Sequence, residues 1–137
     1  MKARRMTDRI DWRELLATAK KARTRAYAPY SKYRVGAAVL GASGKIYAGC
    51  NVENSSYGLT ICAERSAVVN AVSAGERRIL AIAIAVGKTP APSCGMCRQV
   101  LAEFAGPQLP IALVAGRERR LFTLGELLPH AFGKHYF

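Results

Sequence analysis

Four cysteines are the residues of this chain whose type and spacing could do chemistry: Cys50, Cys62, Cys94 and Cys97. Cys94 and Cys97 lie three residues apart, so both thiols can reach one ion from the first turn of a helix. Cys62 can supply a third ligand if two helix starts face each other in the fold. Three thiolates select zinc over harder cations such as magnesium or calcium. The cysteines therefore predict a zinc site.

The number of protein ligands decides what such a zinc site does. Three ligands leave one tetrahedral position for water, as in catalytic sites, whereas four ligands close a structural site. Cys50 is the candidate fourth ligand, but it ends an apolar, strand-like run, so we expect a small core residue there. We expect His130 and His135 to be ordinary surface or core histidines. The pattern favours an open site with one zinc ion per chain.

Glu64 lies two residues after Cys62, close to the predicted metal but not obviously bound to it. A carboxylate beside a zinc-bound water can take the proton of that water and deliver it elsewhere. Taken alone, Glu64 would be a favourable negative charge in the first turn of a helix. Beside a three-thiolate site, we interpret it as a general acid–base residue.

The elements that must position these residues follow from hydrophobic periodicity and turn signals. Helices are predicted over residues 11–25, 61–74 and 95–104, and strands over 35–40, 45–50, 79–86 and 109–114, with a short strand or helix over 121–128. Both cysteine segments then lie where a loop enters a helix, and the helix dipole there favours a thiolate. Helices between the later strands predict an α/β fold, in which helices cover both faces of a mixed sheet.

Length and composition exclude several classes of protein. The 137 residues predict one domain, 1–137, with 1–10 as a flexible basic N-terminus. Because 50% of the residues are apolar and 22% charged, a packed core is feasible and global disorder is excluded. The apolar runs are too short to cross a bilayer, and none follows the basic N-terminus. We therefore expect a cytoplasmic protein with reduced cysteines and no membrane partner.

The charge is strongly positive, with 21 Lys and Arg against 9 Asp and Glu and a formal net charge of +12. Such a surface attracts polyanions. The basic residues are scattered along the sequence and lack the interleaved aromatic residues that stack on bases. We therefore favour a solvated basic surface, which would contact nucleic acid only non-specifically, over a dedicated RNA-binding function.

Six segments carry a more specific signal, in the order Tyr-Ala-Pro-Tyr-Ser-Lys-Tyr (27–33), Val-Gly-Ala-Ala (35–38), Asn-Val-Glu-Asn (51–54), Cys-Ala-Glu-Arg (62–65), Cys-Gly-Met-Cys-Arg-Gln (94–99) and Glu-Leu-Leu-Pro (126–129). Together they resemble the small, homotetrameric cytidine deaminases that hold zinc with three cysteines. The cysteine–glutamate pattern is shared by zinc nucleobase deaminases. The resemblance covers residues 26–133 and implies a three-layer α/β/α fold with a mixed five-stranded sheet.

The resemblance implies an activity: hydrolytic deamination of cytidine and deoxycytidine to uridine and deoxyuridine, in pyrimidine salvage. The enzyme would be a hydrolase acting on the C–N bond of a cyclic amidine. Zinc would be held by Cys62, Cys94 and Cys97. Glu64 would take the proton of the zinc-bound water and pass it to N3 and then to the departing amine. Arg65 would donate to the thiolates and offset their excess negative charge, the alternative being an exposed helical charge.

The resemblance also implies residues that hold the nucleoside. Asn51 and Glu53 would hydrogen-bond the ribose 3′-hydroxyl, although both could instead serve the turn that they begin. Further substrate contacts would come from Ala63, Tyr33 and Phe132. In a homotetramer Phe132 would reach the active site of a neighbouring subunit, with Tyr30 as a weaker candidate for the subunit contact. The alternative is that Phe132 caps its own core.

Three positions depart from the family pattern. Ser93 replaces the usual proline before Cys94, which puts the backbone leading into that helix in question. Tyr33 replaces a base-stacking phenylalanine and adds a hydroxyl that needs a partner. Arg34 replaces a common proline, which leaves polymer binding open.

Three other functions compete with cytidine deamination. A modified cytosine nucleoside such as blasticidin S could be the substrate, but the Asn-Val-Glu-Asn segment favours an ordinary ribose. Editing of a polynucleotide is supported only by the high net positive charge of the chain. A basic, zinc-stabilised nucleic-acid binding module would be no enzyme and would need a fourth protein ligand.

Overall fold

The structure is a computed structural model that describes residues 10–137, so the expected flexible N-terminus lies outside the described residues except for Ile10. The elements are α2 (Trp12–Arg23), β1 (Gly36–Gly41), β2 (Ile46–Cys50), η1 (Tyr57–Leu59), α3 (Ala63–Ser73), β3 (Ile79–Val86), α4 (Gly95–Phe104), β4 (Pro110–Ala115), β5 (Glu118–Thr123), α5 (Leu124–Leu127) and η2 (Lys134–Tyr136). Across residues 10–137, no helix is both long and apolar enough to cross a membrane.

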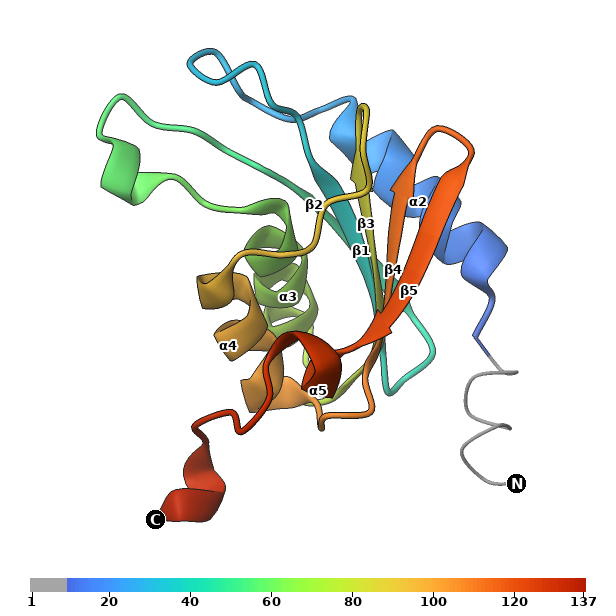
Figure 1. Ribbon diagram of the computed structural model, residues 1–137, viewed down its shortest axis with the longest axis vertical. Helices are drawn as coiled ribbons and strands as arrows, with labels where there is room; N and C mark the ends of the chain where they lie inside the picture. Colours follow the sequence, from blue (N-terminus) through green and yellow to red (C-terminus); the bar gives the residue numbers. More distant parts are fainter. Residues whose placement is uncertain (1–9) are drawn as a thin grey trace.

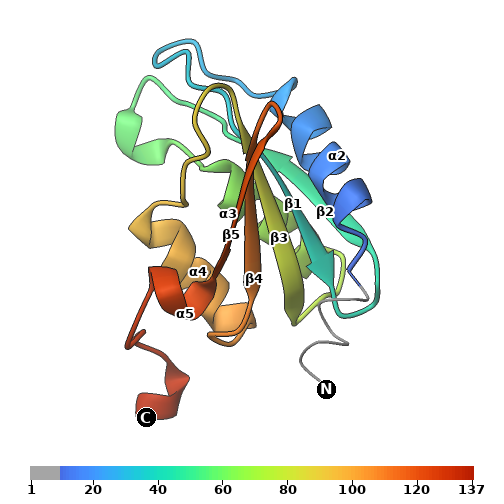
Figure 2. The ribbon, with the colours of Figure 1, turned by 45° about the vertical axis from the view of Figure 1, so that its right-hand side comes forward.

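The strands form one mixed five-stranded sheet in the order β2-β1-β3-β4-β5. β3 and β4 pair in parallel, and the other neighbours pair antiparallel. Figures 1 and 2 show α2 on one face of the sheet and α3 with α4 on the other. The predicted mixed sheet, with helices on both faces, is confirmed.

The central strand β3 is apolar throughout because both of its faces are covered. Its residues Ala81, Ala83 and Ala85 pack with α2, whereas Ile82 and Ile84 pack in the cluster that contains α3 and α4. The small side chains on the α2 side let that helix lie close to the sheet. α2 begins at the N-cap Asp11, whose carboxylate accepts from the backbone N–H of Glu14.

The segment predicted as a short strand or helix over 121–128 contains parts of both. β5 begins at Glu118, three residues earlier than expected, because a turn at Gly116 with φ of 60° folds it back onto β4. Its start is hard to see in the sequence, since Arg119 and Arg120 are exposed on an edge strand. α5 follows directly through a capping box between Thr123 and Glu126.

We expect Gly36→Ala to lower the free energy of unfolding by about 1–3 kcal/mol, the usual cost of overpacking. A Cβ at Gly36 would lie 2.1 Å from the carbonyl oxygen of Ala19 and 2.3 Å from the backbone nitrogen of Arg23. These are main-chain atoms of α2 and cannot rotate away. Urea unfolding followed by circular dichroism measures the change. The matched control is Gly58→Ala, where a Cβ has no atom within 4 Å, and an equal loss there would contradict the packing explanation.

Candidate metal centre and active site

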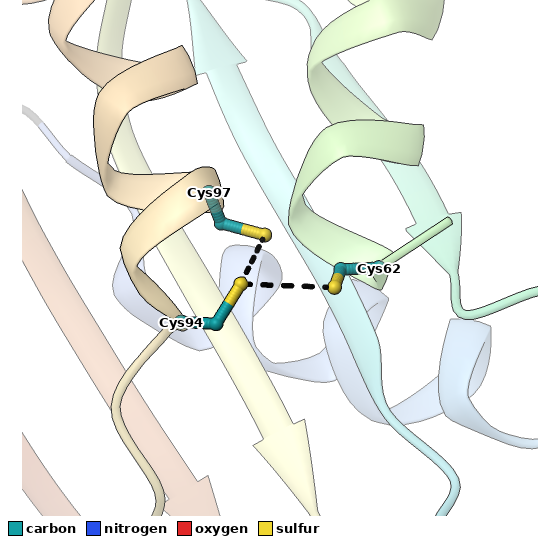
Figure 3. A group of neighbouring side chains, drawn as sticks. All are labelled: Cys62, Cys94 and Cys97. Carbon is teal, nitrogen blue, oxygen red and sulfur yellow. Dashed lines mark hydrogen bonds between the residues drawn. The ribbon is translucent and has the colours of Figure 1, made fainter. Parts of the chain in front are cut away.

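Three cysteines from two helix starts come together on the face of the sheet that α3 and α4 cover. Cys62 is the N-cap of α3, Cys94 is the N-cap of α4, and Cys97 lies in the first turn of α4. The Sγ atoms of Cys62 and Cys94 are 3.9 Å apart, and those of Cys94 and Cys97 are 3.4 Å apart (Figure 3). The predicted facing of the two helix starts is thus present in the fold.

The three thiols fit a zinc ion without rearrangement of the chain. Tetrahedral zinc with Zn–S bonds of about 2.3 Å requires sulfur atoms about 3.8 Å apart, close to the two observed separations. All three ligand atoms lie within 4.8 Å of one another, and Cys50 is not in this group. Cys50 is half-buried at the end of β2 and lines a separate hollow with Lys21 and Asn70, so it is less buried than the core residue we expected.

Arg65 supplies positive charge to the cysteine group. Its Nη2 donates to the carbonyl oxygen of Thr60 at 3.1 Å and to Sγ of Cys62 at 3.7 Å. Hydrogen bonding from Cys97 and from this guanidinium lowers the pKa of Cys62 to about 5. The hydrogen bond between Cys62 and Cys97, together with burial, raises the pKa of Cys97. One thiol of the group is therefore ionised readily before any metal binds.

Glu64 lies in the first turn of α3 with only 5% of its surface exposed. Burial raises the pKa of this carboxyl to about 7, although its own backbone N–H opposes the shift, and the neighbouring Cys62 raises the pKa further. A carboxyl with such a pKa can both accept and release a proton near neutral pH. Its place in the fold therefore suits a proton carrier beside the cysteines.

Asn51 and Glu53 lie on the segment between β2 and α3, and both fix the loop that precedes β1. The side chain of Asn51 accepts from the backbone N–H of Val35 at 2.9 Å and donates to the carbonyl oxygen of Tyr33 at 2.8 Å. Glu53 accepts from the backbone N–H groups of Tyr30 and Ser31 and from the hydroxyl of Ser31. Both side chains therefore have a structural role, but they hold the loop over 30–35 and not the turn that they begin.

Asn51 and Glu53 can each form further hydrogen bonds beyond those within the protein. A carboxylate offers about four acceptor sites, and Glu53 uses three of them. Hydrogen bonding from Ser31, above all from its hydroxyl, lowers the pKa of Glu53 and keeps it ionised. Asn51 retains one N–H and one lone pair. One hydroxyl of a ligand can thus still bind to each residue.

A hollow of about 310 Å³ opens beside Glu53 and is lined by Tyr30, Ser31, Glu53, Tyr57 and Thr60. Its volume lies at the lower end of the range for small-molecule sites. Thr60 connects this hollow to the cysteine group, because its carbonyl oxygen accepts from Arg65. Tyr33 follows Ser31 along the loop and is 50% exposed, whereas Ala63 is fully buried at the start of α3.

Two residues of the quoted segments received no role from the sequence, and both tie α4 to the C-terminal part of the chain. Arg98 donates to the carbonyl oxygens of Ser93 and Leu127 at 2.8 and 2.6 Å. Gln99 donates to the carbonyl oxygen of Phe132 at 2.9 Å. Their position directly after Cys97 was the available signal, but the partners Leu127 and Phe132 are about thirty residues away along the chain.

The remaining predicted positions are found as follows. Phe132 is 63% exposed and stacks on Tyr136 at the surface, so it does not cap its own core. Ser93 does not disturb the start of α4, since Cys94 keeps the extended backbone of an N-cap. The Ser93 hydroxyl is buried and has no hydrogen-bond partner among residues 10–137. His130 and His135 are both exposed.

Comparison with known proteins identifies relatives over most of the chain. The model of the cytidine and deoxycytidylate deaminase zinc-binding region matches residues 10–113, which contain all three clustered cysteines. A cytidine deaminase of Sporosarcina psychrophila is 47% identical over 127 residues, covering 91% of this chain and 93% of that protein. A cytidine deaminase of Mycobacterium tuberculosis is 48% identical over 125 residues, covering 90% of this chain and 91% of that protein.

Solved structures agree with these relatives. The crystal structure of cytidine deaminase from Burkholderia pseudomallei matches with a TM-score of 0.85 and 45% identity, covering 90% of this chain and 100% of that chain. The cytidine deaminase of Mycobacterium tuberculosis matches with a TM-score of 0.77 and 45% identity, covering 90% and 98%. The resemblance drawn from the six sequence segments is confirmed.

We expect Cys50→Ser to retain about one zinc ion per chain and Cys94→Ser to lose most of its zinc, because only the second change removes a thiol of the cluster. Elemental analysis of the purified, dialysed proteins measures the zinc-to-protein ratio. Circular dichroism serves as the control that both variants are folded. Loss of zinc from Cys50→Ser would instead indicate a structural site closed by four cysteines.

Proposed function

The chain belongs to the family of cytidine and deoxycytidylate deaminases and acts as a zinc-dependent hydrolase on cytidine; we propose that it converts cytidine and deoxycytidine to uridine and deoxyuridine and ammonia. The observation that carries the proposal is the buried carboxyl of Glu64 beside a three-thiol group. We further propose that residues 1–137 act as one domain, in the cytoplasm, in pyrimidine salvage.

Cys62, Cys94 and Cys97 would hold the zinc ion, with Arg65 offsetting part of the thiolate charge. When bound, the ion lowers the pKa of a water molecule so that hydroxide is available at neutral pH. Glu64 accepts the proton of the attacking water and donates it to ring nitrogen N3 while the oxygen bonds to C4. A second proton passes through Glu64 to the amine, which leaves as ammonia as the C4–N bond breaks.

The sugar would be held by Asn51 and Glu53. Each keeps hydrogen-bonding capacity after its contacts within the protein, and Glu53 lines the hollow beside the cysteine group. Both are already fixed by bonds to the loop around Tyr33, so little entropy is lost when a ribose hydroxyl binds. Tyr33 and Ala63 would complete the contacts with the nucleoside.

We propose that the enzyme is a homotetramer in which Phe132 contacts the nucleoside of a neighbouring subunit. Exposed apolar side chains gather around the hollow at Tyr30, Tyr57, Leu59 and Ile61, and the rings of Phe132, Tyr136 and Phe137 form a second exposed group. Exposed apolar groups of this kind mark interaction surfaces. Because each subunit carries a net charge of +12, association should strengthen as salt screens the repulsion.

The proposed activity is tested by following ultraviolet absorbance with cytidine, deoxycytidine, cytosine and blasticidin S. We expect turnover of both nucleosides and a much lower kcat/KM for cytosine. Without a ribose, the hydrogen-bonding sites that Asn51 and Glu53 keep free gain no partner from the ligand, so the transition state loses this stabilisation. Equal kcat/KM for cytosine and cytidine would show that these residues do not bind the sugar, and faster turnover of blasticidin S would replace the proposed substrate.

Glu64→Gln should keep its zinc and its fold but lower kcat by about 10²- to 10⁴-fold or more, because an amide cannot accept the proton. Zinc content and kcat are measured on the same preparation. The matched control is Glu103→Gln on the exposed surface of α4, which should leave kcat unchanged. Near-wild-type turnover in zinc-loaded Glu64→Gln would remove Glu64 from the mechanism.

Phe132→Ala should raise KM for cytidine more than it lowers kcat or zinc content, since the ring would contact substrate and not metal. Leu121→Ala, also exposed but on β5, is the matched control and should leave KM unchanged. Sedimentation velocity at moderate ionic strength should show a tetramer. A fully active monomer at micromolar concentration would falsify the shared site.

A further inference from the structure

Basic residues that are scattered along the sequence gather at one end of the sheet. This cationic rim consists of Lys20, Arg23, Arg34, Lys88 and Arg117. It lies at the end where β1 begins and β3 and β4 finish, as the pairing of Gly36 with Ala85 and the β4–β5 turn after Ala115 show. In Figure 1 this is the upper end of the sheet, where the last turn of α2 also lies.

Contacts between distant segments hold the rim together. The Lys20 ammonium donates to the carbonyl oxygen of Gly116 at 3.1 Å, next to Arg117 in the β4–β5 turn. Nε of Arg23 donates to the carbonyl oxygen of Arg34 at 3.1 Å. The Arg23 guanidinium also lies over Gly87, next to Lys88, because a Cβ added to Gly87 would be 2.7 Å from it. The last turn of α2 thus brings the three other segments into one surface.

The positive charge of the rim is not used to pair with carboxylates in these contacts. Lys20 and Arg23 both donate to main-chain carbonyl groups, which fix the two cations in place but leave their charge. The acidic residue in the same turn is Glu118, and it is flanked by Arg117 and Arg119. Other acidic groups are engaged elsewhere: Glu76, for example, accepts from Ser43 at the opposite end of the sheet.

We propose that the cationic rim binds the phosphate backbone of nucleic acid without reading its sequence. Fixed guanidinium and ammonium groups are the donors that phosphate oxygens accept from, and such contacts supply affinity but no base specificity. A membrane surface would call for apolar side chains among the cations. Among the described residues, Tyr33 is the exposed large apolar side chain that neighbours a rim residue in the sequence, whereas the larger exposed groups lie around the hollow at Glu53 and at Phe132. The rim adjoins the proposed nucleoside site at Arg34, next to Tyr33, but none of its five residues has a role in the proposed deamination.

The test uses the full zinc-loaded chain and a fluorescent, mixed-sequence, single-stranded RNA of ~20 nucleotides, with binding followed by anisotropy. We expect micromolar binding at about 50 mM salt and a slope of log K against log salt near −3, for four to five phosphate contacts at about −0.7 each. Absence of binding at this salt concentration, or binding to anionic phosphatidylserine vesicles but not to RNA, would overturn the proposal.

Two variants of equal net charge separate the rim from the overall charge. Lys88→Glu with Arg117→Glu reverses two exposed rim cations. Arg13→Glu with Arg78→Glu makes the same charge change at the opposite end, where α2 begins and β3 starts. We expect the rim variant to weaken RNA binding by about tenfold or more and flatten the slope by about 1–2, and the control by about threefold at most.

Neither pair of substitutions touches the cysteines, Glu64, Asn51 or Glu53, so the turnover of cytidine should be unchanged in both variants. This assay makes the two proposals distinguishable, because inactive wild-type protein that binds RNA overturns only the proposed function. An equal loss of RNA binding in both variants would mean that the net charge of +12 acts diffusely, which would overturn the rim as a site.

Discussion

The rest of the structure depends on the placement of two helix N-termini beside each other. Cys62 and Cys94 are the N-caps of α3 and α4, and neither side chain caps its own helix. Their thiols are therefore free to meet, while the partial positive charge of both helix ends favours thiolates. A small shift of one helix against the other would separate sulfur atoms that now stand at zinc-ligand spacing.

Close packing fixes these two helix ends. α3 rests on β2 at Gly49, where a Cβ would lie 2.3 Å from the backbone nitrogen of Ala67, so no larger residue could keep this approach. α4 is anchored by the fully buried Leu101 and by Arg98, which bonds to Ser93 on one side and to Leu127 on the other. The positions of the three cysteines therefore depend on how α3 packs on the sheet and on how α4 is bonded to α5.

Features that depend on local sequence could be predicted, and features that depend on long-range contacts could not. The cysteine spacing and the apolar run of β3 are local, and both agree with the structure. The start of β5 at Glu118 was missed although its partner β4 is adjacent in the sequence, because the first residues of β5 are charged and exposed. The partner of Gln99 was missed because it lies 33 residues away along the chain. The gathering of Lys20, Arg34 and Arg117 was missed for the same reason.

Asn51 and Glu53 show why structural and functional explanations of one residue need not compete. Glu53 holds the backbone of Tyr30 and Ser31, and all three residues line the same hollow. Removing the carboxylate would therefore change the shape of the hollow as well as any contact with a sugar. A mutation at Glu53 cannot separate the two effects, whereas a substrate without the ribose leaves the loop intact. Sugar recognition is therefore isolated by changing the substrate, from cytidine to cytosine, and not by changing the protein.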